Sequence, residues 1–182
     1  MIKKTSYKTP FDRTYWVIPG RFLAGAYPGD TDPGEADLKL AGLLRCGIVR
    51  VINLMEAEEK GHFGEPFVPY EKHLEIMAEK LRIKVSTTRI AVKDVSVPTS
   101  ATMKMILDEI DRPVVVGQAV YAHCWGGRGR TGTVVGCYLV RHGLPGMEAL
   151  ERINHLRRNC ADASSFSPET AEQREMVLSW KE

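Results

Sequence analysis

One ten-residue segment in the second half of the chain carries the residue types best suited to chemistry. It reads His-Cys-Trp-Gly-Gly-Arg-Gly-Arg-Thr-Gly and runs from His123 to Gly132. Cys124 offers a sulfur nucleophile at the start of the segment, and Arg130 offers a guanidinium near its end. Because apolar runs stand on both sides, the pattern predicts a loop between a buried strand and a buried helix.

A strand–loop–helix junction presents backbone amides at a helix N-terminus, where anions bind readily. Gly126, Gly127 and Gly129 allow the loop to curl so that its amides converge on one point. The amides, the helix N-terminus and Arg130 all favour the thiolate form of Cys124. Arg130 also presents a two-pronged donor to phosphate oxygens. A nucleophile and an anion clamp in one loop suit phosphoryl transfer through a cysteinyl-phosphate.

The segment resembles the Cys-x5-Arg loop of the protein tyrosine phosphatase superfamily, in the form His-Cys-x-x-Gly-x-x-Arg-Thr. His123, Cys124, Gly127, Arg130 and Thr131 fill every fixed position of that pattern. The resemblance implies that Cys124 is the nucleophile and that Arg130 binds phosphate and stabilises the transition state. It also implies that Thr131 hydrogen-bonds the sulfur and that His123 supports the loop from behind. The alternative, an inert cysteine beside a glycine turn, leaves the clustered glycines and arginines unexplained.

The remaining loop residues are expected to contact the phosphate as well: Trp125, Gly126, Gly127, Arg128 and Gly129. Arg128 adds a second positive charge, which is similar to the loops of lipid-phosphate phosphatases. Those loops are rich in lysine, however, and here Trp125 follows the cysteine. An Arg128 side chain that points to solvent is the alternative.

Hydrolysis also needs a general acid that protonates the leaving oxygen. In the compact dual-specificity branch of the superfamily this is an aspartate on a loop before the cysteine. Asp94 lies 30 residues before Cys124, directly after a predicted strand, and its surroundings resemble that loop. An ordinary exposed aspartate is the alternative, and Asp108 and Asp111 are poorer candidates because a predicted helix carries them.

Two further residues are candidates by resemblance. The segment 167–173 resembles the late segment that positions the hydrolytic water in some relatives, although Glu169 stands where tyrosine-specific enzymes have glutamine. Gln173 is therefore a candidate for that role, with an exposed helical glutamine as the alternative. Asn53, at the end of a predicted strand, is a candidate to order the next loop. The glutamates of that loop are expected to form a solvated face: Glu56, Glu58 and Glu59.

The elements that must position these residues follow from hydrophobic periodicity and capping signals. Strands are expected at 21–26, 48–54, 84–92 and 118–123. Helices are expected at 32–46, 70–81, between Pro98 and Pro113, at 130–142 and 145–158, and from Ser167 onward. Alternating strands and helices predict an α/β fold with a central, mostly parallel sheet flanked by helices. We expect a single phosphatase domain over 1–182, with an irregular lead-in at 1–20.

Composition agrees with an ordinary globular enzyme. The 182 residues are 43% apolar and 26% charged, and the net charge of +2 gives no reason to expect a nucleic-acid partner. No run approaches the roughly 20 apolar residues of a membrane span. No secretory signal is visible, so a cytoplasmic location without membrane insertion is predicted. The four cysteines include no Cys-x-x-Cys pair, which favours reduced thiols, and His123 next to Cys124 is not a zinc-ligand spacing, so no metal is expected. No other cofactor is expected either.

The sequence thus predicts a metal-independent phosphomonoester hydrolase of the dual-specificity-like type. Its expected substrates are phosphotyrosine proteins or peptides, and also phosphoserine and phosphothreonine ones, since the Asn-Arg-Tyr recognition loop of tyrosine-specific enzymes is absent. Alternatives are a phosphoinositide phosphatase, supported by Arg128, and a sulfurtransferase, whose loop closes one residue sooner. A non-catalytic phosphoprotein-binding module is disfavoured because Cys124, Arg130 and Asp94 are all present. The sequence gives no indication of the oligomeric state.

Overall fold

The core of the fold is a five-stranded sheet, seen in a computed structural model that describes residues 7–61 and 63–182. The strands lie in the order β1 (Thr14–Ile18), β2 (Phe22–Gly25), β5 (Ala119–His123), β3 (Ile48–Asn53) and β4 (Ser86–Arg89). β1 is antiparallel to β2, and every other neighbouring pair is parallel. The predicted α/β class with a mostly parallel sheet is therefore confirmed.

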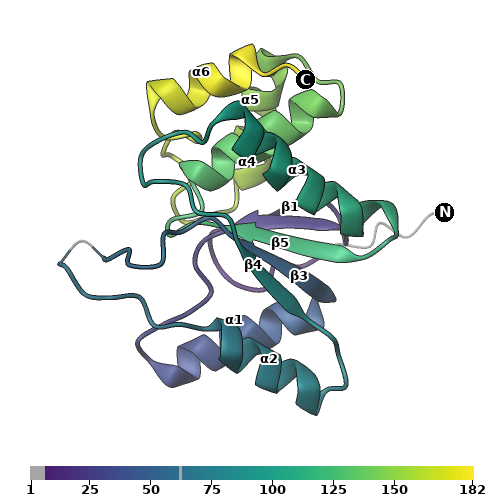
Figure 1. The fold of residues 1–182 in the computed structure, drawn as a ribbon, viewed down its shortest axis with the longest axis vertical. Coiled ribbons are helices and arrows are strands. Elements are labelled where there is room, and N and C mark those ends of the chain that lie inside the picture. The colour runs from purple at the N-terminus through teal and green to yellow at the C-terminus, as the bar shows by residue number, and fades with distance from the viewer. Residues whose placement is uncertain (1–6, 62) are drawn as a thin grey trace.

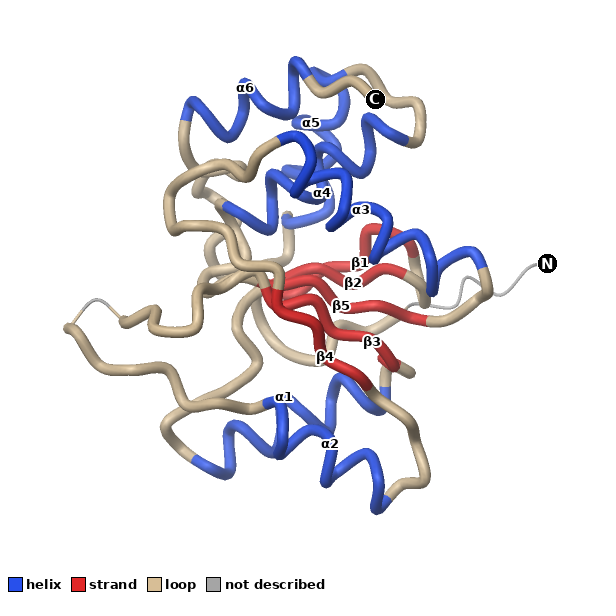
Figure 2. Tube along the Cα trace, viewed as in Figure 1, coloured by secondary structure: helices blue, strands red, loops and turns tan. Residues whose placement is uncertain are grey.

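Helices cover both faces of this sheet (Figures 1 and 2). One face carries α3 (Ser100–Val115), α4 (Arg130–Arg141), α5 (Gly146–Arg157) and α6 (Ala171–Ser179). The opposite face carries α1 (Pro33–Arg45) and α2 (Glu71–Lys80). α1 starts as the sequence predicts: Asp32 Oδ1 accepts from the amides of Gly34 and Glu35, and Pro33 stands in the first turn.

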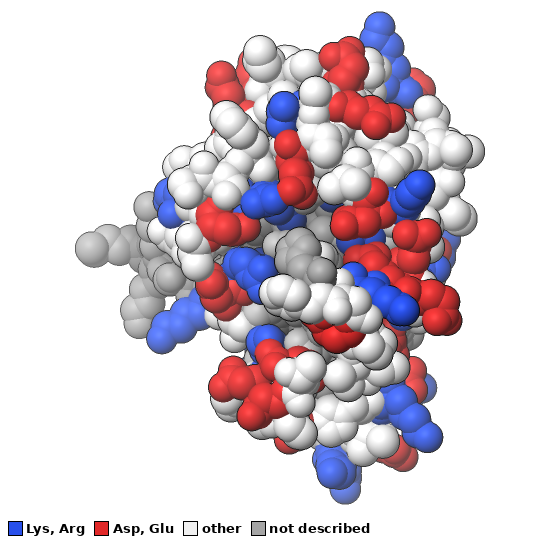
Figure 3. Space-filling model, turned by 90° about the vertical axis from the view of Figure 1, so that its left-hand side faces the viewer, with Lys and Arg blue, Asp and Glu red and all other residues white. Residues whose placement is uncertain are grey.

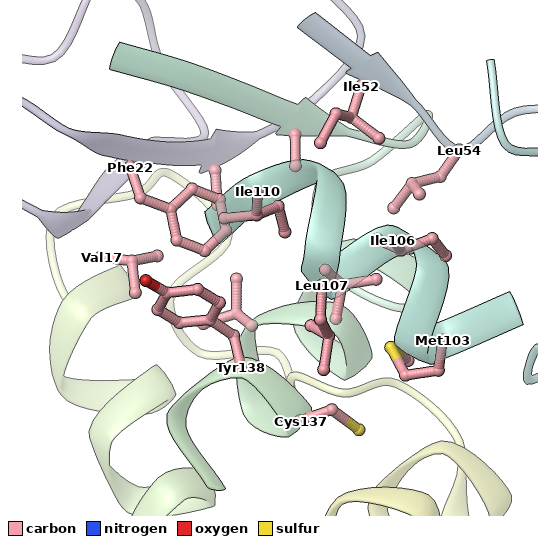
Figure 4. Packing of buried hydrophobic residues seen from close by; sticks show 14 of the residues in the cluster. Val17, Phe22, Ile52, Leu54, Met103, Ile106, Leu107, Ile110, Cys137 and Tyr138 are labelled. Atoms are coloured by element: carbon pink, nitrogen blue, oxygen red, sulfur yellow. The ribbon is translucent and has the colours of Figure 1, made fainter. Parts of the chain in front are cut away.

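The larger hydrophobic cluster lies between the sheet and helices α3 and α4 (Figure 4). Phe22 of β2 packs edge-on against Tyr138 of α4, with 4.9 Å between the ring centroids, and Leu107 and Ile110 of α3 are fully buried beside them. Each fully buried side chain of this kind stabilises the fold by about 1.5–3 kcal/mol. This packing holds α4, which begins where the Cys124 loop ends, against the sheet.

Three elements differ from the sequence-based expectation. Residues 14–18, expected to be irregular, form the edge strand β1, because Tyr15 and Val17 pack into the core beside β2. α3 continues past Pro113 and ends at Val115, because the proline falls in the last turn and costs only one backbone hydrogen bond. α6 begins at Ala171 rather than at Ser167, with Thr170 as its N-cap.

Candidate active site

Three carbonyl groups in or next to the loop between β5 and α4 are engaged by neighbouring segments. The carbonyls of His123, Trp125 and Arg128 each accept a hydrogen bond from a neighbouring segment. The donors are Leu54 N (2.9 Å), Tyr27 N (2.9 Å) and Ser167 Oγ (2.8 Å), respectively. Within residues 7–61 and 63–182, no acceptor engages the amides from Gly126 to Gly129. The loop therefore presents a row of unengaged N–H donors, which is the arrangement that binds an anion.

Two glycines make this loop conformation possible. Gly127 has φ +73°, and a Cβ atom there would lie 2.4 Å from the backbone carbon of Gly25, so no other residue fits. Gly129 is the N-cap of α4, and no side chain of the described residues caps the first amides of that helix. The positive end of α4 therefore faces the same point as the loop amides.

Cys124 is 3% exposed and lines a cavity of about 420 Å³ that the loop encloses. Arg128, Arg130 and Asp94 line the same cavity, so the fold brings the main predicted residues together. Arg13, Asp162 and Glu169 complete its mouth. Figure 3 shows the face of the molecule that carries these loops. Acidic and basic side chains are interspersed on it.

His123 is fully buried behind Cys124 and holds the loop through both ring nitrogens. Nδ1 lies 3.1 Å from the Cys124 carbonyl, which can only accept, so Nδ1 carries the proton. Nε2 therefore accepts from the Tyr70 hydroxyl at 2.6 Å. Burial lowers the pKa of His123 to about 3, and the charges of Arg89 and Arg130 act in the same direction. The ring is neutral under ordinary conditions.

The Arg130 side chain is only 2% exposed and is held by an unexpected partner. Its Nη1 and Nη2 donate to the two carboxylate oxygens of Glu59 at 2.6 and 2.7 Å, and Nη1 also donates to the Val92 carbonyl. The Glu59 side chain is 8% exposed, so the prediction of a solvated glutamate face was wrong at this position. A buried carboxylate needs a charged partner, and residue types alone do not reveal which loop glutamate reaches one.

One donor of Arg130 remains unused. Its Nε is buried and has no hydrogen-bond partner among the described residues, an arrangement that costs about 1–3 kcal/mol. Burial by itself disfavours the charge, but the bonds to Glu59 and the nearby acidic groups outweigh it and raise the pKa of Arg130 above its ordinary value.

Asp94 lies at the mouth of the cavity in the loop after β4. Its side chain is 48% exposed, and Oδ1 lies 2.9 Å from Nη2 of Arg130. Val95 beside it adopts φ +50°, a left-handed conformation that is unfavourable for a β-branched residue. The loop is held by Gln173, whose Nε2 donates to the Ser96 carbonyl at 3.1 Å.

Gln173 is fully buried, so it is not the exposed helical residue that the sequence left open. Its Oε1 accepts from the amides of Glu169 and Thr170, and its own amide donates to Thr170 Oγ1, forming a capping box at the start of α6. A Cβ atom at Gly129 would lie 3.1 Å from Gln173 Oε1. Gln173 thus contacts both the loop between β5 and α4, called the phosphate loop below, and the loop that carries Asp94.

Three other predicted residues have well-defined partners. The Thr131 hydroxyl donates to the Gly25 carbonyl at 3.3 Å and not, within the described residues, to the Cys124 sulfur. Asn53 is buried, accepts from the amide of Met55 at 2.9 Å and donates to a carboxylate on α2. Arg128 forms an ion pair with Glu169. The described residues contain no cluster of His, Cys, Asp and Glu that is arranged for a metal ion.

No helix in residues 7–61 and 63–182 combines the length and apolar character needed to cross a bilayer.

Comparison with known proteins identifies the family to which this chain belongs. Residues 12–176 match the family described as Swiss Army Knife protein, DSP-PTPase phosphatase domain (PTP-SAK). The chain is 34% identical over 99 residues to an uncharacterized protein of Methanocaldococcus jannaschii, covering 54% of this chain and 61% of that protein. It is 26% identical over 166 residues to dual specificity protein phosphatase CDC14B of Mus musculus, covering 85% and 29%. It therefore spans less than two thirds of the length of these curated relatives.

Solved structures share the fold. Tk-PTP in its active form is 28% identical and superposes with a TM-score of 0.63, covering 91% of this chain and 93% of that one. PTPMT1 in complex with PI(5)P is 22% identical with a TM-score of 0.66, covering 92% and 93%. The chain thus shares its fold with these two structures.

Proposed function

The chain belongs to the DSP-PTPase phosphatase family, and from that premise we propose that it hydrolyses phosphomonoesters through a cysteinyl-phosphate formed on Cys124. The loop geometry carries the proposal. Three carbonyls in or next to it are engaged by neighbouring segments, its amides from Gly126 to Gly129 are unengaged, and Cys124 lies in the cavity that they enclose. Arg130 lines the same cavity and adds a positive charge to it. These groups match three equatorial phosphoryl oxygens and a nucleophile in line with the leaving group.

In the first step the Cys124 thiolate attacks phosphorus. The sulfur–phosphorus bond forms, the bond from phosphorus to the ester oxygen breaks, and the electron pair goes to that oxygen. Asp94, in its protonated form, gives the leaving oxygen a proton. The loop amides and Arg130 hold the negative charge on the other phosphoryl oxygens throughout.

In the second step a water molecule attacks phosphorus and the sulfur leaves as thiolate. Asp94, now a carboxylate, takes the proton from that water, so the enzyme returns to its starting state. Thr131 lies next to Arg130 at the start of α4, and we propose that it stabilises the departing sulfur. For Gln173, contact with both loops supports a role in holding Asp94 as well as the predicted role in positioning water.

We further propose that Glu59 orients Arg130. The Glu59 carboxylate accepts hydrogen bonds from Nη1 and Nη2 of Arg130, so only Nε has no acceptor among the described residues. A guanidinium held in this way is already oriented when substrate arrives, so less conformational entropy is lost on binding. The buried pair also keeps Arg130 from turning away from the cavity.

Phosphorylated proteins or peptides are the substrate class that we propose, with phosphotyrosine preferred. Trp125 stands at the cavity and offers an aromatic edge for an aryl phosphate, worth about 0.5–1.5 kcal/mol. PTPMT1 is described with PI(5)P, but at 22% identity it supports the fold alone. Because Glu169 pairs with Arg128, the residue that suggested a phosphoinositide substrate already has a counter-ion.

Steady-state hydrolysis of an aryl phosphate in EDTA tests the proposal. We expect turnover in the wild type and none in Cys124→Ser, which keeps the amides and Arg130 and so still binds phosphate. A serine variant that kept a tenth of the activity would exclude the covalent mechanism. Phosphate binding without turnover in the wild type would instead identify a phosphoprotein-binding module.

A further inference from the structure

A second cavity lies beside the phosphate cavity and shares two side chains with it. Arg13 and Trp125 line both, and the second cavity has a volume of about 210 Å³. Part of its wall is aromatic: Trp125 lies edge-on to Phe67 at 5.5 Å, and Phe67 lies edge-on to Tyr27 at 5.0 Å between ring centroids. Two carboxylates also line it, Asp30, which pairs with Lys39, and Glu65, which accepts from a backbone amide. A group bound through phosphate in the first cavity therefore has a neighbouring space directly beside it.

Arg13 is the one cation around these two cavities without an acidic partner in residues 7–61 and 63–182. Arg130 pairs with Glu59 and Asp94, and Arg128 pairs with Glu169. Lys39, in the second cavity, pairs with an aspartate at 2.6 Å. No ion pair or side-chain hydrogen bond engages the Arg13 guanidinium within the described residues, so its charge is available to a ligand.

The backbone of Arg13 is fixed although the side chain is exposed. The residue has φ +56°, a left-handed conformation that costs a non-glycine residue roughly 1–2 kcal/mol. Its amide donates to Asp12 Oδ1 at 2.7 Å, and its carbonyl accepts from Ala26 N at 3.1 Å. The backbone position from which the Arg13 side chain extends is therefore fixed. It lies at the boundary of the two cavities, directly before β1.

We propose that Arg13 and the aromatic wall form a subsite for the residue next to the phosphorylated residue of a peptide, and that this subsite favours an acidic side chain. The inference rests on the proposed phosphatase function and adds which type of side chain is preferred next to the phosphorylated residue. Aromatic edges pack against the peptide stem while Arg13 binds a carboxylate or a second phosphate. Because Arg13 is exposed, the gain is modest: roughly two- to fivefold in kcat/KM, falling at high salt.

Three series of phosphotyrosine peptides test this subsite. They carry glutamine, glutamate or phosphothreonine in turn at each position flanking the phosphotyrosine. We expect the wild type to prefer the two acidic series by about two- to fivefold and Arg13→Gln to lose that preference. Arg21→Gln is the matched control, since Arg21 is also exposed but precedes β2 at the opposite end of the sheet; it should keep the wild-type preference.

Binding of the same peptides to Cys124→Ser separates this inference from the proposed function. If turnover fails but the acidic peptides still bind better, with the preference lost on adding Arg13→Gln, the subsite stands and the catalytic proposal falls. Equal binding of all peptides, or a preference that survives Arg13→Gln, overturns the subsite. A soluble inositol bisphosphate that outperforms every peptide, and loses its lead in Arg13→Gln, overturns the assignment to a peptide.

Discussion

At the scale of single residues, the site is organised around competition for Arg130. Glu59 occupies two of its nitrogens, and the exposed carboxylate of Asp94 contacts Nη2 at 2.9 Å. A phosphate dianion in the cavity would approach the same guanidinium. Because Asp94 is nearly half exposed, it can move away, whereas the buried Glu59 cannot. Asp94 therefore has two proposed effects of opposite sign, one on binding and one on catalysis.

Replacing Asp94 separates these effects. Asp94→Asn removes a competing anion, so vanadate or phosphate should bind about two- to fivefold more tightly. It also removes the acid, so kcat should fall by roughly 10²–10⁴-fold for substrates with poor leaving groups. Asp108→Asn is the control, because Asp108 is equally exposed and pairs with Arg141 away from the cavity. Weaker vanadate binding together with an unchanged kcat would contradict both assignments.

His123 predicts a specific pH dependence of stability. In the unfolded chain the ring titrates near 6.5, while burial holds its pKa near 3 in the fold. Below pH 6.5 the unfolded state binds a proton that the folded state does not, so the free energy of unfolding falls as pH drops from 6.5 towards 3. Between pH 7 and pH 5 this amounts to about 2 kcal/mol, measured by urea unfolding. The dependence should disappear in His123→Asn.

The His123 ring can also be observed directly by NMR. Its nitrogen shifts should report a neutral ring with the proton on Nδ1 down to pH 5, as the bond to the Cys124 carbonyl requires. A midpoint near 6.5 for His123 would show that the ring is not buried against the loop.

Oxidation by peroxide should distinguish the cysteines. Burial raises the pKa of Cys137 to about 12 and that of Cys160 to about 11, so both remain unreactive thiols. Cys124 should be modified first and recovered by added thiol, as peptide mass spectrometry can show. Cys46 lies before β3 at the opposite end of the sheet, roughly 16 Å away along the strand, too far for a disulfide with Cys124. Earlier modification of Cys137 would contradict this order.

At the scale of elements, the site depends on contacts between loops that are distant in sequence. The start of α6 holds the Asp94 loop through Gln173 and Ser96, and Ser167 holds the phosphate loop through the Arg128 carbonyl. Asn53 orders the first turn of the loop that carries Glu59. Hydrogen bonds therefore link the start of α6 to both loops.

Removing the Gln173 contact should loosen the acid loop. Gln173→Met keeps the volume but loses the bond to Ser96, so we expect kcat to fall by about ten- to hundredfold, most strongly for poor leaving groups. The capping box is lost too, at about 0.5–2 kcal/mol of stability. Thr170→Ala removes the cap alone and should lose stability while keeping kcat. If both variants lost activity equally, Gln173 would have only a structural role.

Local sequence signals predicted the elements that depend on local chemistry. The Asp32 cap, the apolar run of α4 and the glycines of the phosphate loop act within a few residues, and each is where the sequence placed it. β1 was missed because a short edge strand gains its stability from Tyr15 and Val17 packing in the core. Glu59 was missed because its burial depends on Arg130, which is 71 residues away in sequence.

At the scale of the whole molecule, the cavity combines segments from both layers. The Glu59 loop joins β3 to α2 on one face of the sheet, while the Asp94 loop and the start of α6 come from the other (Figure 1). They meet where β5 ends and α4 begins. The family match over residues 12–176 includes every one of these segments. The sheet is thus the frame that sets the geometry of Cys124, Arg130 and Asp94.

Direct trapping of the intermediate tests the central claim. Wild-type protein is mixed with an aryl phosphate, quenched in acid within the first turnover, digested and analysed by mass spectrometry. The account predicts one added phosphoryl group on the peptide that contains Cys124, with more of it in Asp94→Asn, where Asp94 no longer activates the attacking water. It predicts none in Cys124→Ser. Turnover without any phosphorylated Cys124 peptide, or a phosphoryl group on another residue, would contradict the account.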